Sequence, residues 1–207
     1  MRSFRSEPFL WIHVAGLAVL PLWLQIVWLG LAVGDPRLPI WLELFLVAAF
    51  GSVPVFWMQW SRPFNIFSLL LVALKPEQLT QQQRQILSVF KTRKHRFLTV
   101  VAAVVLLWGL WQLYRVAPAV AMVASFFPQW RIAGLLLGGL AFGASNLFLQ
   151  VPVSVLGVLS TSEKQLETLE PWAAEKIPQD FVVPGFRVGI ILPTPATEAT
   201  ESSSQAE

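Results

Sequence analysis

Apolar residues dominate four long stretches of the chain, and polar residues gather in the segments between them. The stretches run over about 9–33, 40–60, 97–116 and 132–159. At about 1.5 Å per residue, a helix of any of these lengths crosses a hydrocarbon core of about 30 Å. The pattern therefore predicts an all-α integral membrane protein with four transmembrane helices, which together form a membrane domain over residues 1–160.

Proline marks the start and the middle of the first predicted span. Ser6, Glu7 and Pro8 form a helix-start pattern, and Pro21 is expected to kink the helix. The apolar run 9–33 is much longer than the about 7–15 apolar residues of a secretory signal. We therefore expect a retained span rather than a cleaved leader.

The segment 61–96 between the second and third spans is strongly basic. It holds seven of the fifteen Lys and Arg residues and a single acid, Glu77. Basic loops tend to stay on the cytoplasmic side of a membrane. Four spans then place both termini on that side, together with twelve of the fifteen cationic side chains. The predicted topology has both termini and the basic loop in the cytoplasm.

Two apolar features lie within this loop. Residues 64–74 are apolar but too short to span, so we expect them to lie in the interface or to re-enter shallowly. Thr80 and Gln83 have the spacing of a capping box. The helix that they begin is amphipathic, with an apolar side made by Leu79, Ile86, Leu87, Val89, Phe90 and Phe97. This pattern predicts an interfacial helix lying on the membrane surface.

Cations lie on the polar side of the same helix and continue up to the start of the third span. They predict contact with anionic membrane lipid or with an acidic partner, because each adds attraction near a charged surface. His95 lies among them and is expected to be solvated. The predicted lipid- or partner-binding residues are Arg84, Lys91, Arg93, Lys94 and Arg96.

The chain after the fourth span changes character twice. Residues 161–192 are predicted to form a short cytoplasmic segment, with a polar helix over about 162–170. Residues 193–207 contain only Thr, Pro, Ala, Glu, Ser and Gln. A segment of this composition cannot bury enough apolar surface to fold, so we predict a disordered low-complexity tail.

Small residues form two ridges along the fourth span. One contains Gly134 and Gly138, and the other Gly139 and Gly143. Such ridges allow helices to approach closely. Packing within the chain is the main interpretation, and contact with a partner subunit or a pigment is an alternative. Asn146 and Gln150 continue the second ridge and allow a third interpretation, a polar transport path.

Ionisable groups are scarce inside the spans. Glu43 lies one turn into the second span, where Arg37, Arg115 and Arg131 are candidate partners in a snorkelling interfacial pair. A coupling-ion or proton site is the alternative. His13 lies in the first span and is a candidate axial ligand for haem or chlorophyll, or a residue that hydrogen-bonds a neighbour.

Composition excludes several classes of function. The 207 residues are 55% hydrophobic and 13% charged, and they include no Cys and two His. No metal site is predicted, no cofactor is required, and no catalytic constellation is present, so we do not expect an enzyme. Nucleic acid is not an expected partner, because the cations lie between spans.

Two segments resemble a known family. They are RSFRSEPFLWIHVAGLAVLPLWL near the N-terminus and SRPFNIFSLLLVALKPEQLTQQQRQIL in the basic loop. They are similar to the cyanobacterial low-complexity tail membrane proteins, and the Thr-, Pro-, Glu- and Ser-rich end fits that name. The resemblance implies a thylakoid or plasma membrane setting and brings no activity with it.

The first hypothesis is a non-enzymatic membrane accessory or assembly protein. It would dock on a larger membrane complex, with a photosynthetic complex as one candidate, through the fourth span and the basic loop. The alternative is a small transporter or channel component, which needs a polar path through Asn146 and Gln150.

Overall fold

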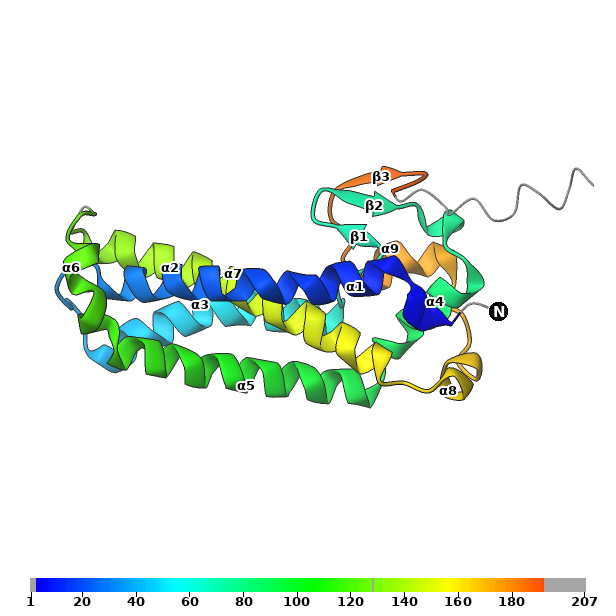
Figure 1. Cartoon of the computed structure of the whole chain (residues 1–207), viewed down its shortest axis with the longest axis horizontal. Coiled ribbons are helices and arrows are strands. Elements are labelled where there is room, and N and C mark those ends of the chain that lie inside the picture. Colours follow the sequence, from blue (N-terminus) through cyan, green and yellow to red (C-terminus); the bar gives the residue numbers. More distant parts are fainter. Residues whose placement is uncertain (1–2, 128, 192–207) are drawn as a thin grey trace, which may run out of the picture.

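Four long helices form a bundle that confirms the predicted membrane fold (Figure 1). The computed structural model describes residues 3–127 and 129–191, so the predicted tail lies outside the described residues. Each of the four helices is long and apolar enough to cross a membrane. They are α1 (Pro8–Ala15) continued through η2 (Gly16–Val19) into α2 (Leu20–Ala32), then α3 (Ile40–Ser61), α5 (Arg93–Arg115) and α7 (Arg131–Leu159).

The first span changes its winding just before Pro21. Pro21 has no N–H group to donate to the carbonyl of Leu17. The N–H of Leu20 donates to that carbonyl instead, which tightens Gly16–Val19 into a 3₁₀ helix. The third span begins at Arg93, four residues earlier than predicted, because the Thr92 hydroxyl accepts from the N–H of His95 as a helix cap.

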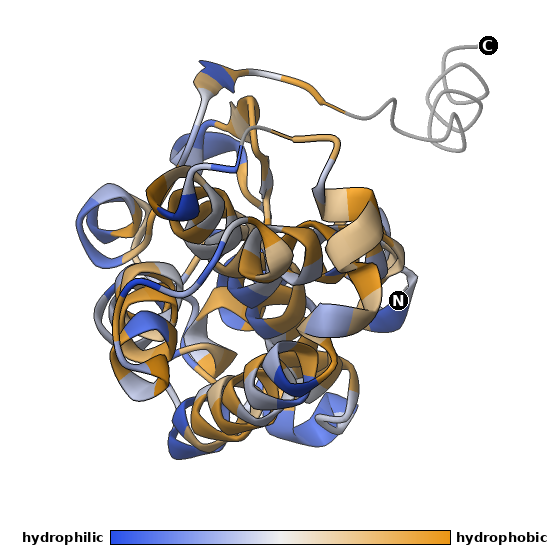
Figure 2. Ribbon diagram, turned by 90° about the vertical axis from the view of Figure 1, so that its left-hand side faces the viewer, coloured by the Kyte–Doolittle hydropathy of each residue, from blue (hydrophilic) through white to orange (hydrophobic). Residues whose placement is uncertain are grey.

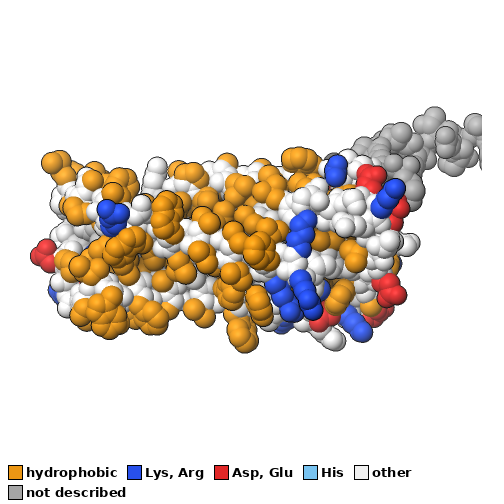
Figure 3. All heavy atoms as spheres, turned by 90° about the horizontal axis from the view of Figure 1, so that it is seen from below, with side chains coloured by type: hydrophobic (Ala, Val, Ile, Leu, Met, Phe, Trp, Pro, Cys, Tyr) orange, Lys and Arg blue, Asp and Glu red, His pale blue; other side chains and the backbone are white. Residues whose placement is uncertain are grey.

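Helix α7 is the centre of the bundle, and it contacts α1, α2, α3 and α5. The outward surfaces of the surrounding helices carry large exposed apolar side chains, among them Phe50, Val104 and Trp108. Figure 3 shows hydrophobic side chains along the length of the bundle, with most charges gathered at one end. This distribution is that of a protein solvated by lipid over most of its length.

The charged end of the bundle carries a folded headpiece, made of residues 3–7, 62–92 and 160–191. Its helices are η1 (Phe4–Ser6), η3 (Pro76–Gln78), α4 (Gln81–Val89), α8 (Glu163–Glu167), η5 (Ala174–Lys176) and α9 (Ile177–Asp180). The core of the headpiece includes Phe4, Phe67, Leu87, Ile177 and Phe181, all nearly inaccessible to solvent. At the far end of the bundle, η4 (Ala117–Val120) and α6 (Ala121–Ala124) follow α5.

A small sheet, which the sequence did not predict, completes the headpiece. Strand β1 (Ser68–Leu69) pairs antiparallel with β2 (Val72–Leu74), and β2 pairs parallel with β3 (Phe186–Val188). Figures 1 and 2 place the sheet to one side of the bundle, at the headpiece end. Residues 64–68 are buried in the protein, so they do not lie in lipid as predicted.

The predicted interfacial helix forms as α4, but its apolar side faces the protein. The capping box between Thr80 and Gln83 is present, with both reciprocal hydrogen bonds. Ile86, Leu87 and Val89 are buried in the headpiece core. The prediction that this side lies on the membrane is therefore corrected. The apolar side of α4 packs against the headpiece core of the same chain.

Candidate functional site

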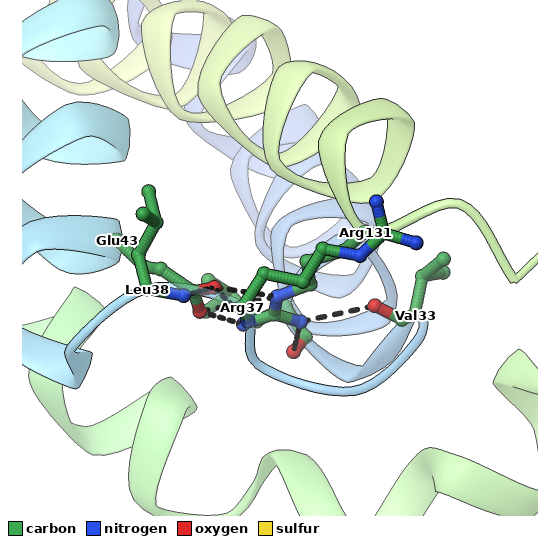
Figure 4. A network of polar contacts seen from close by, with 6 residues as sticks. Val33, Arg37, Leu38, Glu43 and Arg131 are labelled. Atoms are coloured by element: carbon green, nitrogen blue, oxygen red, sulfur yellow. Dashed lines mark hydrogen bonds and ion pairs between the residues drawn. The ribbon is translucent and has the colours of Figure 1, made fainter.

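A buried ion pair joins three helices at the far end of the bundle (Figure 4). Glu43 of α3 is 0% exposed and Arg131 of α7 is 2% exposed. The Nε of Arg131 lies 3.1 Å from each carboxylate oxygen of Glu43. Its Nη1 donates to the carbonyls of Leu31 at 2.7 Å and Val33 at 3.0 Å. The pair thus ties the start of α7 to the end of α2 and to the first turn of α3.

The turn between α2 and α3 completes this network. The backbone N–H groups of Arg37 and Leu38 donate to Oε1 of Glu43 at 3.1 and 3.4 Å. Of the three predicted partners, the structure selects Arg131, and it buries the pair instead of letting it snorkel to the interface. Both carboxylate oxygens are occupied by donors from the chain, which is the geometry of a structural clamp and gives no support to a coupling-ion site.

The glycines of α7 contact α2 and α3 of the same chain. A Cβ added to Gly30 would lie 2.7 Å from the carbonyl oxygen of Gly134 and 2.8 Å from the nitrogen of Gly138. One added to Gly51 would lie 2.9 Å from backbone atoms of Gly139 and Gly143. Both ridges are therefore covered within the bundle. A partner subunit or pigment would have to displace a helix to reach them.

Asn146 and Gln150 are fully buried in α7. The side-chain amide of Asn146 donates to the carbonyl of Phe142 at 2.9 Å, and that of Gln150 donates to Oδ1 of Asn146 at 3.0 Å. The side-chain oxygen of Gln150 has no hydrogen-bond partner among the described residues. These bonds run along α7 itself, which gives a transport path no support.

Two lysines of the basic segment bind the ends of helices. Nζ of Lys91 donates to the carbonyls of Ser61 at 3.2 Å and Asp180 at 2.9 Å, the last residues of α3 and α9. Nζ of Lys94 donates to the carbonyl of Gly157 and to the hydroxyl of Ser160 at the end of α7. Cations at helix C-termini stabilise the unpaired carbonyls and the negative end of the dipole.

The surroundings of Lys91 also affect its charge. Burial lowers the pKa of the Lys91 ammonium, Asp180 raises it, and Arg96 and Arg62 lower it. The ammonium lies 5.1 Å from the ring centroid of Phe181, in a cation–π contact. Lys91 is therefore integrated into the headpiece rather than displayed on a surface.

The arginines of the predicted binding set have different environments. Arg93 and Arg96 are exposed, and Arg84 is half-buried. The guanidinium of Arg96 lies 5.3 Å from the ring centroid of Trp60. Arg and Trp together are typical of a membrane–water interface. Contact of Arg84, Arg93 and Arg96 with lipid or a partner remains a prediction.

The second histidine, His95, differs from its predicted environment. It is 4% exposed, and its ring lies 5.2 Å from that of Phe90. Its Nε2 is 3.4 Å from the carbonyl oxygen of Gln59. The prediction of a solvated side chain is wrong, because the turn before α5 folds Phe90 over the ring.

The other histidine lies in an apolar slot at the headpiece end of the bundle. Nδ1 of His13 is 2.8 Å from the carbonyl oxygen of Phe9, so it donates to that carbonyl, and the backbone of Ser68 also lies beside the ring. The ring packs edge-on against Phe64, with centroids 5.8 Å apart. The slot has a volume of about 220 Å³, below the about 300–1,000 Å³ of typical sites for small molecules and cofactors.

A polar cleft of about 600 Å³ lies in the headpiece between η1, α4 and α8. Gln81, Gln82 and Gln85 of α4 line one side, and Glu163 and Glu167 of α8 line the other. Sequence reasoning missed this cleft. Its signals, a glutamine run and two acids four residues apart, are separated by about 80 positions in the chain.

No group of three His, Asp or Glu side chains that could hold a metal ion occurs within residues 3–127 and 129–191.

A model of a protein family described as low-complexity tail membrane protein-like matches residues 6–193. The match covers nearly the whole chain, including the bundle and the headpiece. No match was found among curated proteins or among solved structures.

Proposed function

We propose that the chain, which belongs to the low-complexity tail membrane protein-like family, is a non-catalytic membrane accessory or assembly protein. In this proposal it docks on a larger membrane complex through its headpiece. The observation that carries the proposal is the polar cleft of about 600 Å³ between η1, α4 and α8.

The bundle supports the headpiece as the docking part. The glycine ridges of α7 are covered by α2 and α3. Lys91 and Lys94, two of the predicted binding cations, are held by helix ends. Of the docking surface that we proposed from the sequence, the fourth span is thereby set aside, and the basic loop is kept where its helix α4 lines the cleft and where Arg93 and Arg96 are exposed.

The side chains of the cleft indicate the chemistry of the partner. Three glutamines both donate and accept hydrogen bonds, and two glutamates accept them and carry negative charge. Phe4 and Leu166 add apolar contact. A polar, positively charged segment of a partner protein fits this lining best. The positive-inside rule supports a cytoplasmic headpiece, and the family resemblance supports a thylakoid or plasma membrane as its setting.

Affinity purification of the tagged full chain from native membranes in mild detergent tests the proposal. Glu167→Lys reverses one charge in the cleft, and Glu175→Lys reverses one exposed charge outside it. The wild type and Glu175→Lys should migrate with a larger complex on native gels. Glu167→Lys should lose most of this co-migration. A monomeric wild type, or equal behaviour of the two variants, would contradict docking through the cleft.

A further inference from the structure

The apolar slot beside His13 lies where the bundle meets the headpiece. One wall is α1 and η2 of the first span, a second is α7, and the third is the β1–β2 hairpin with the nearby Phe64. His13 is the only ionisable side chain in its lining. Ile12 on one wall is 39% exposed and Leu70 on another is 53% exposed, so the slot is continuous with the apolar surface of the first span.

The hairpin wall ends in an exposed apolar tip. Leu71 is 75% exposed, and Phe186, the first residue of β3, is 80% exposed. The N–H of Phe186 donates to the carbonyl of Leu71 at 2.9 Å, which holds these residues side by side. In Figure 1 the β1–β2 turn points along the bundle, away from the rest of the headpiece. That direction leads toward the lipid-covered part of the bundle.

We propose that the slot holds an acyl chain of a membrane glycerolipid from the leaflet next to the headpiece. An extended hydrocarbon chain needs an apolar, narrow cavity that opens sideways to lipid, and the walls supply these properties. The exposed hairpin tip dips into the same leaflet and keeps water from the opening. Because the bilayer is already apolar, van der Waals contact with the slot walls, rather than transfer from water, holds the chain.

The size of the slot favours a chain over a macrocycle. Its volume of about 220 Å³ lies below that of typical cofactor sites. The ring of His13 is held by Phe9 and Phe64 at the wall.

Photo-crosslinking in vesicles tests the proposal. The full chain is reconstituted in phosphatidylcholine vesicles that contain phosphatidylcholine with a diazirine on one acyl chain. Crosslinked peptides are then mapped by mass spectrometry. We expect many more crosslinks on residues 147–152 of α7 than on the exposed face of α5 around Val104. Crosslinks spread evenly over the lipid-facing helices would overturn the proposal.

Two glycine variants give a matched comparison. A Cβ at Gly16, which lines the slot, meets Phe148 at an ordinary 3.5 Å, so a Leu side chain that starts there extends toward the slot, whereas Gly109 on α5 faces open space. Because the Leu side chain takes the space that an acyl chain would occupy, most of the slot crosslinking should be lost in Gly16→Leu. Gly109→Leu should match the wild type. Unchanged crosslinking in Gly16→Leu, or an equal loss in both variants, would refute the slot as the site.

The absence of Cys from the sequence permits a second measurement. Leu71→Cys, Val104→Cys and Gln82→Cys each carry one environment-sensitive fluorophore in vesicles of brominated phosphatidylcholine. Leu71→Cys should be quenched like Val104→Cys on the lipid face, and Gln82→Cys in the polar cleft should not. If Leu71→Cys behaves like Gln82→Cys, the hairpin lies in water and the proposal fails. Neither measurement involves a protein partner, so failure here leaves docking through the cleft standing.

Discussion

Arg131→Met should destabilise the protein strongly, because it leaves the Glu43 carboxylate buried without a cation. Glu43 is 0% exposed, and after the change only the N–H groups of Arg37 and Leu38 remain as its donors. Breaking a buried pair in this way costs about 3–5 kcal/mol in the free energy of unfolding. An exposed interfacial pair would contribute at most about 1 kcal/mol. A buried pair and an exposed interfacial pair therefore predict clearly different losses in the free energy of unfolding.

A double-mutant cycle separates the pair from its surroundings. Glu43→Leu alone should also cost about 3–5 kcal/mol, since it leaves the guanidinium of Arg131 without a carboxylate. The double variant Glu43→Leu/Arg131→Met removes both charges, so it should cost at least about 2 kcal/mol less than the sum of the single changes. The carbonyls of Leu31 and Val33 lose their donor in the double variant, which prevents full recovery.

The assay is unfolding of the purified chain in detergent micelles by added dodecyl sulfate, followed by the fluorescence of its ten Trp residues. Arg115→Met is the matched control, because Arg115 is an exposed cation at the same end of the bundle. It should change stability by less than about 0.5 kcal/mol. If Arg131→Met and Arg115→Met differ by less than about 1 kcal/mol, or if the cycle is additive, the clamp is refuted.

Two further predictions concern packing and pH. Gly51→Leu should lower the free energy of unfolding by more than about 2 kcal/mol, because its Cβ would lie 2.9 Å from the backbone of α7. Gly109→Leu on an open face should change it by less than about 0.5 kcal/mol. The same unfolding assay compares the two variants, and equal costs would contradict the packing of α3 on α7. Burial raises the pKa of Glu7 above its ordinary 4.5, so the stability of the wild type should fall as pH rises through the window above that value. Glu7→Gln lacks this titration, so its stability relative to the wild type should grow from pH 4 toward pH 7 in thermal melts, and a constant difference would show that Glu7 is not perturbed.

The spans were predictable because lipid imposes one strong requirement on the sequence. A helix that crosses hydrocarbon needs about 20 apolar residues, whatever it packs against. The capping box at Thr80 was predictable for a similar reason, since both of its hydrogen bonds form within four residues. Constraints of this kind involve residues that are close in the sequence, so they can be recognised from the sequence alone.

The environment of an apolar face was not predictable. The spacing of apolar residues along α4 is the same whether Ile86 and Leu87 contact lipid or protein. In the structure they meet Phe4 and Phe181, which come from the two ends of the described chain. Periodicity identifies the side of a helix that avoids water, but the partner of that side depends on distant segments.

The depth of a charged residue in the membrane was easier to predict than the neighbour that it contacts. The sequence placed Arg37, Arg115 and Arg131 at the depth of Glu43 but could not choose among them. Arg131 is the partner because α7 lies between α2 and α3, an arrangement set by the glycine contacts. The same limit applies to His95, where charged neighbours suggested water and the fold supplied Phe90 instead.

The clamp and the glycine contacts also restrict how a partner can bind. For a partner to use the ridges of α7, either α2 or α3 would have to move away from it. That movement would separate backbones in close contact at Gly30 or Gly51 and pull on the network around Glu43 and Arg131. The cost would include the about 3–5 kcal/mol of a broken buried pair, which weakens binding by roughly two to four factors of ten. The headpiece cleft and the lipid slot need no such movement, so a partner or lipid that binds there meets the bundle already closed.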